Sequence, residues 1–68
     1  MTAKKLIAKY TNQLNELDEQ IKMATKLKNE ARRAKEDDKF DYQLNEIQKF
    51  NVARQKVVQF IKDLEDIL

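Results

Sequence analysis

The segment that decides the fold is Lys35-Glu36-Asp37-Asp38-Lys39, which separates two long series of regularly spaced apolar residues. Its adjacent aspartates are the poorest helix formers in the chain, whereas the residues around it are mostly good helix formers. We therefore predict a turn at residues 36–39, with Asp37 or Asp38 as the N-cap of the helix that follows. The glycine that commonly ends a helix is missing, because the chain contains none.

Apolar residues recur at steps of three and four on both sides of this segment, which is the period of one helix face. Before the segment they are Ala3, Ile7, Tyr10, Leu14, Leu17, Ile21, Ala24, Leu27, Ala31 and Ala34. After it they are Phe40, Leu44, Ile47, Phe50, Ala53, Val57, Ile61, Leu64 and Leu68. We expect an all-α chain with helices over about 3–35 and 39–67, forming a single domain over residues 1–68.

An antiparallel two-helix hairpin pairs the two series, with facing residue numbers adding to about 75. Tyr10 then faces Leu64, Leu27 faces Ile47, and Ala24 faces Phe50, which fills the seam with large residues against small ones. The alternative is one unbroken helix of more than about 60 residues in a long coiled coil. A parallel dimer of such helices would stack alanine on alanine, so the pattern favours the hairpin.

The charge pattern also favours the hairpin. Residues 1–35 carry nine basic and four acidic side chains, net +5, and residues 36–68 carry five basic and eight acidic ones, net −3. Antiparallel arms bring these opposite net charges side by side. We expect ion pairs that select the pairing more than they stabilise it, with Arg54 near Asp18 or Glu19 and Lys9 near Asp63 or Asp66.

Two helices bury only one stripe each, and a chain of this length has little core to offset its conformational entropy. Apolar residues outside the seam gather at the open end of the hairpin, in an arc too wide for one helix to cover. We predict that this surface binds a second hairpin, in a homodimeric four-helix bundle, or another protein. The predicted partner-interface residues are Leu6, Ile7, Tyr10, Val57, Phe60, Leu64 and Ile67.

The composition argues against enzymatic chemistry. The chain has no Cys, His or Gly, which removes thiolate and imidazole groups, the commonest metal ligands and phosphate-cradling loops. We expect no catalytic residue, no cofactor and no metal site. No stretch approaches the ~18 apolar residues of a membrane span, and no secretory signal is visible, so the expected location is the cytoplasm.

The predicted function is therefore protein–protein interaction or oligomerisation, in a small helical accessory or regulatory protein of phage or plasmid type. The alternative is a small dimeric regulator that binds RNA or DNA backbone through the basic face of the first helix. The residues that would do so are Lys22, Lys26, Lys28, Arg32, Arg33 and Lys35. A simpler interpretation is that these side chains are solvated and pair with the acidic second arm, because no aromatic residue is interleaved to stack on bases.

Overall fold

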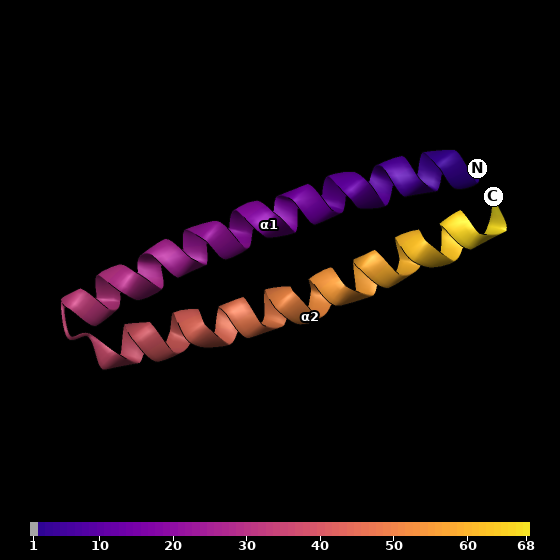
Figure 1. The fold of residues 1–68 in the computed structure, drawn as a ribbon. Coiled ribbons are helices and arrows are strands. Elements are labelled where there is room, and N and C mark those ends of the chain that lie inside the picture. The colour runs from indigo at the N-terminus through magenta and orange to yellow at the C-terminus, as the bar shows by residue number, and fades with distance from the viewer. Residues whose placement is uncertain (1) are drawn as a thin grey trace.

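A computed structural model describes residues 2–68 as two long α-helices joined by a tight turn (Figure 1). Helix α1 runs from Ala3 to Arg33 and helix α2 from Asp37 to Ile67. The helices are antiparallel, so α1 begins and α2 ends at the same end of the hairpin (Figure 1). The expected all-α hairpin is confirmed, and the alternative of one continuous helix is excluded. Its Cα atoms extend over 50 × 14 × 13 Å.

The turn is a Schellman motif built without glycine. The Glu36 N–H donates to the Ala31 carbonyl at 2.9 Å, and the Lys35 N–H donates to the Arg32 carbonyl at 3.2 Å. These bonds satisfy two carbonyls that the end of α1 would otherwise leave unpaired. The motif requires a left-handed residue, and Lys35 takes that position with φ of 57°. A lysine therefore occupies the position that glycine usually fills.

The two helix starts differ in how they are capped. Thr2 is the N-cap of α1, and its Oγ1 accepts the Lys5 N–H at 3.3 Å. Glu36 is the N-cap of α2 but makes no side-chain capping bond. The prediction that Asp37 or Asp38 is this N-cap was wrong, because the left-handed residue completes the chain reversal earlier than expected. Both aspartates lie in the first turn of α2 instead, where the helix dipole favours negative charge.

The earlier turn also changes the pairing register. Because α1 ends at residue 33 and α2 begins at residue 37, facing numbers add to about 70 rather than 75. The rings of Tyr10 and Phe60 lie with their centroids 5.7 Å apart and their planes inclined by 39°. Tyr10 was expected to face Leu64, so the contact is displaced by about one helical turn.

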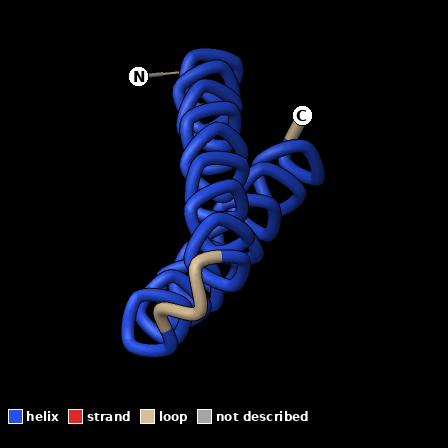
Figure 2. Tube along the Cα trace, turned by 90° about the vertical axis from the view of Figure 1, so that its left-hand side faces the viewer, coloured by secondary structure: helices blue, strands red, loops and turns tan. Residues whose placement is uncertain are grey.

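The core between the helices is thin. Among the described residues only Ala24, Ala31 and Val57 are buried, with 4%, 6% and 8% of their surfaces exposed, and no large side chain is fully buried. Two of these three core residues are alanines, which bring little apolar area to the seam. Figure 2 shows that the axes of the two helices are inclined to each other, so the helices are not parallel along their whole length.

Two leucines expected in the seam lie at its edges. Leu27 and Leu44 are 40% and 37% exposed, whereas the polar residues Lys28 and Gln43 are half-buried. The reason is that the seam follows an unbroken seven-residue repeat, whose successive members stay within about 20° of each other on a helix. On α1 this repeat is Ala3, Tyr10, Leu17, Ala24 and Ala31.

Candidate interaction surfaces

Among the described residues, one ion pair joins the two helices. The Arg54 Nε donates to the Asp18 Oδ1 at 2.8 Å, which confirms one of the expected ion pairs between the arms. The expected pairing of Lys9 with Asp63 or Asp66 does not form among the described residues. Asp63 instead accepts a hydrogen bond from the Gln59 Nε2 at 2.8 Å. The Asp18–Arg54 contact shows which sides of α1 and α2 lie next to each other.

We call this side of the hairpin the ion-pair face. Helix periodicity places on it the residues seven and fourteen positions from Asp18 and Arg54, together with their neighbours three and four positions away. On α1 the face consists of Lys4, Ile7, Thr11, Leu14, Asp18, Ile21, Thr25, Lys28 and Arg32. On α2 it consists of Asp37, Phe40, Leu44, Ile47, Asn51, Arg54, Val58, Ile61, Glu65 and Leu68.

The opposite side, which we call the Phe60 face, carries a mixture of apolar and polar side chains. A shallow groove runs along this face, and residues of both helices line it. These residues show which sides of α1 and α2 lie next to each other on this face: Gln20, Met23, Ala24, Leu27, Tyr42, Gln43, Glu46 and Phe50. The seven-residue repeat extends this face to Leu6 and Gln13 on α1 and to Phe60 and Ile67 on α2. Phe60 is 48% exposed despite its contact with Tyr10.

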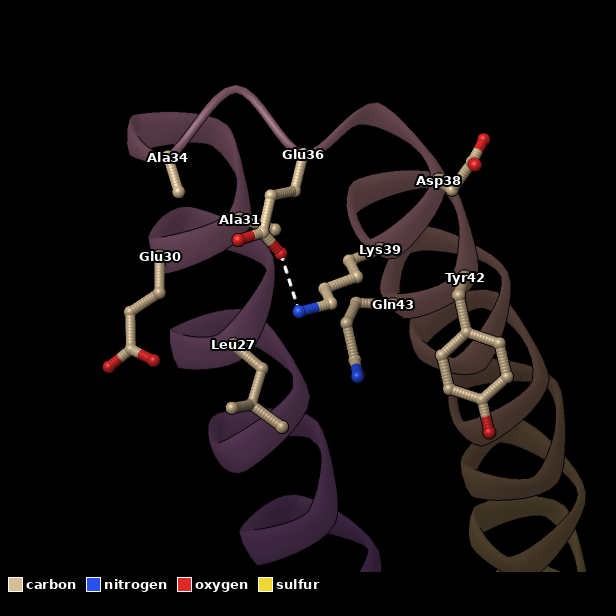
Figure 3. A pocket seen from close by; sticks show the side chains of 9 residues that line it. All are labelled: Leu27, Glu30, Ala31, Ala34, Glu36, Asp38, Lys39, Tyr42 and Gln43. Carbon is tan, nitrogen blue, oxygen red and sulfur yellow. Dashed lines mark ion pairs between the residues drawn. The ribbon is translucent and has the colours of Figure 1, made fainter.

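The groove continues to the turn as a hollow of about 450 Å³ between the helix ends (Figure 3). Lys39 and Gln43 extend from α2 toward α1 in this hollow. The Lys39 Nζ lies 2.7 Å from the Glu36 Oε2, and this hydrogen bond and the charge of Glu36 raise the pKa of Lys39 above its ordinary value of 10.5. The Lys39 ammonium therefore stays protonated to higher pH than that of a free lysine.

The structure divides the predicted partner-interface residues among three places. Tyr10, Val57 and Leu64 belong to the seam, and Val57 is buried there. Ile7 lies on the ion-pair face. The remaining three, which are Leu6, Phe60 and Ile67, lie on the Phe60 face. Sequence periodicity missed this division because it assigned the open end of the hairpin to one continuous arc.

The predicted basic residues all lie in the second half of α1 and in the turn, and none of the six forms an ion pair with another described residue. All are exposed except Lys28, which is half-buried at the edge of the seam. Arg32 and Arg33 occupy the last turn of α1, where positive charge interacts favourably with the helix dipole. The Arg33 Nε also lies 3.5 Å from the Asn29 carbonyl. The expected pairing of this segment with acids of the second helix is therefore absent from the described residues.

The described residues bring together no group of three acidic side chains suited to a metal ion. Neither helix has a stretch that is long and apolar enough to span a membrane. The chain matches no protein-family model, no curated protein and no solved structure. The surfaces described above are therefore the basis for a functional proposal.

Proposed function

We propose that this chain is a non-enzymatic interaction and oligomerisation module, a small helical accessory or regulatory protein of phage or plasmid type. It works by association through its helix surfaces, first with a second copy of itself in a four-helix bundle. The observation that carries the proposal is the contrast between its core and its surface. Among residues 2–68, three are buried, whereas nine large apolar side chains are exposed.

This contrast has a thermodynamic consequence. Fixing a residue's backbone in one conformation costs about 1–2 kcal/mol, and a thin core recovers little of that sum through apolar burial. Small helical proteins commonly make up the difference by burying a second helix face against a partner. Association is therefore the expected source of much of this protein's stability.

Sedimentation equilibrium across the micromolar range tests the proposal, and we expect a reversible dimer. A double variant, Val58→Glu with Phe60→Glu, places one carboxylate on each face and should yield a monomer whichever face is used. The control adds the same two charges at exposed positions on the outer side of α2, through Gln48→Glu with Gln55→Glu, and should remain associated. A well-folded wild-type monomer at these concentrations would refute the proposal.

A second candidate function is binding of RNA or DNA backbone through the basic residues of α1. The specific observation in its favour is that none of these six cations pairs with a described carboxylate. Helically spaced cations can follow phosphates without reading sequence, and each phosphate neutralised steepens the dependence of affinity on salt.

Fluorescence anisotropy with a short RNA duplex, measured from about 50 to 200 mM salt, tests this second function. If it is correct, Lys22→Gln with Lys26→Gln should lower the salt slope by about one per lost phosphate contact. Lys56→Gln with Lys62→Gln on α2 is the matched control and should leave the slope unchanged. Absence of binding at the lowest salt concentration would remove this candidate.

A further inference from the structure

We propose that the ion-pair face is the homodimer interface, and that two copies pack on it with their turns at the same end. This inference rests on the proposed association. It adds which face is buried, that the partner is a second copy, and how the two copies are oriented. A two-fold axis along the length of the hairpins then places α1 of each copy against α2 of the other. Every helix in the resulting bundle has antiparallel neighbours.

The inner rows of the ion-pair face contain more apolar residues than those of the Phe60 face, although the Phe60 face holds five of the nine large apolar side chains that are exposed among residues 2–68. The inner rows of the ion-pair face, which lie next to the seam, are Ile7, Leu14, Ile21 and Lys28 on α1 and Phe40, Ile47, Arg54, Ile61 and Leu68 on α2, so seven of these nine side chains are apolar. On the Phe60 face the corresponding rows contain Gln13, Gln20, Lys39 and Glu46. Burying a polar group without a partner is costly, and the inner rows of the ion-pair face contain two polar residues, Lys28 and Arg54, against four on the Phe60 face.

The two threonines of the ion-pair face need no partner when they are buried. The Thr11 Oγ1 donates to the Ile7 carbonyl at 2.8 Å, and the Thr25 Oγ1 donates to the Ile21 carbonyl at 2.7 Å. Each hydroxyl hydrogen is thus satisfied within its own helix. Both side chains can therefore enter an apolar interface at little cost.

Charges at the two ends of the face identify the partner and select the orientation. On each helix the edge row of this face is the row of residues, seven positions apart, that lies farther from the seam than the inner row. The edge row of α1 runs from Lys4 to Arg32, and the edge row of α2 runs from Asp37 to Glu65. Lys4 and Glu65 are about equally far from the turn, and Arg32 and Asp37 flank it. With the turns together, Lys4 faces Glu65 of the second copy and Arg32 faces Asp37. With the turns apart, Lys4 would face Arg32 and Asp37 would face Glu65, which is repulsive.

The middle of the face repeats this complementarity. Asp18 and Arg54 already pair within one chain, through the Nε alone. A guanidinium carries five N–H donors, and the others make no hydrogen bond to any described residue. In the dimer with turns together, Asp18 of one copy faces Arg54 of the other, so the four side chains alternate in sign. The opposite orientation would place two Arg54 side chains against each other.

The size of the face also fits a second copy. The Cα extents along its length and width are 50 and 14 Å, which correspond to a projected area of roughly 700 Å² before side chains are added. A standard interface buries about 800 Å² per partner. A second hairpin of the same length covers the whole face, whereas a single helix would leave one of its two helices uncovered.

Two single variants test which face is used. Val58 on the ion-pair face and Phe60 on the opposite face are 41% and 48% exposed and lie two residues apart. Val58→Glu should weaken the dimer at least about 100-fold, because a carboxylate would be buried among apolar side chains. Phe60→Glu should change the dissociation constant by less than about threefold. The reverse result would overturn the inference while leaving the proposed association intact.

Charge reversal tests the orientation. Lys4→Glu with Arg32→Glu should weaken the homodimer about tenfold or more, and so should Asp37→Lys with Glu65→Lys. An equimolar mixture of the two variants should form a heterodimer of about wild-type affinity, because every facing pair is again of opposite sign. The circular dichroism of each variant reports whether its helices remain intact. Unchanged affinity of both folded variants would refute the facing pairs.

A distance measurement closes the test. Because the chain has no cysteine, Asp38→Cys places a single spin label near the turn, outside the ion-pair face. With the turns together the two labels should lie within about 30 Å, the width of a four-helix bundle with side chains. With the turns apart they should lie more than about 40 Å apart, from 1.5 Å of rise per residue. The longer distance in a dimer would overturn this inference alone, whereas a monomeric wild-type chain would overturn it together with the proposed function.

Discussion

Glycine at position 35 should make the protein more stable than alanine at the same position, although glycine inside a helix is destabilising. Lys35 is the only non-glycine residue with positive φ among the described residues, and a left-handed conformation costs an L-residue roughly 1–2 kcal/mol. Glycine avoids that cost, but it makes the unfolded chain more flexible, and the extra entropy lost on folding lowers stability by about 0.5–1 kcal/mol. The net expected gain in the free energy of unfolding is about 1 kcal/mol for Lys35→Gly relative to Lys35→Ala.

The comparison is made with alanine because Lys35 also places a positive charge near the end of α1, worth about 0.3–1 kcal/mol. Both variants lack this charge, so their difference isolates the backbone conformation. Urea unfolding followed by circular dichroism at 222 nm measures it, at one fixed protein concentration because association contributes to apparent stability. A gain of 1 kcal/mol should raise the melting temperature by about 4–8 °C.

The sign of this difference is the decisive result. In a continuous helix, glycine at position 35 would be about 1 kcal/mol less stable than alanine. Lys35→Gly that is equal to or less stable than Lys35→Ala would therefore refute the Schellman turn and, with it, the register derived from the turn.

Three further perturbations test the seam, the cap and the turn hollow. Val57→Ala should lower the free energy of unfolding by about 1.5 kcal/mol in urea melts, whereas Val52→Ala on the exposed surface should stay within about 0.5 kcal/mol; equal effects would refute the seam. Thr2→Ala should reduce helix content and stability by about 0.5–1 kcal/mol, and an unchanged melt would show that the cap is idle. Glu36→Gln should return the Lys39 pKa toward 10.5, followed by NMR titration of the Lys39 side chain. Because the folded pKa is raised, the stabilisation from this pair is complete below pH 10.5 and is lost as pH rises through the folded value; a titration unaffected by the substitution would contradict the pairing.

The sequence by itself determined the element content, because a three- and four-residue apolar repeat on good helix formers leaves little choice but helix. It also determined that the chain reverses near residue 37, and that Arg54 lies near Asp18 or Glu19. These features depend on local helix propensity and on the net charge of each arm, and both can be obtained from the sequence alone.

Only the tertiary structure decided the register and the faces. Register depends on where the left-handed residue sits, and a lysine at that position gives no glycine-like signal in the sequence. The shift of about one helical turn placed Tyr10 on Phe60, and the seven-residue repeat of the seam left Leu27 and Leu44 at its edges. The packing of the two helices also divided one expected apolar arc between two faces. The neighbours of a residue in a helix pair depend on the position of the partner helix as well as on the periodicity of its own helix.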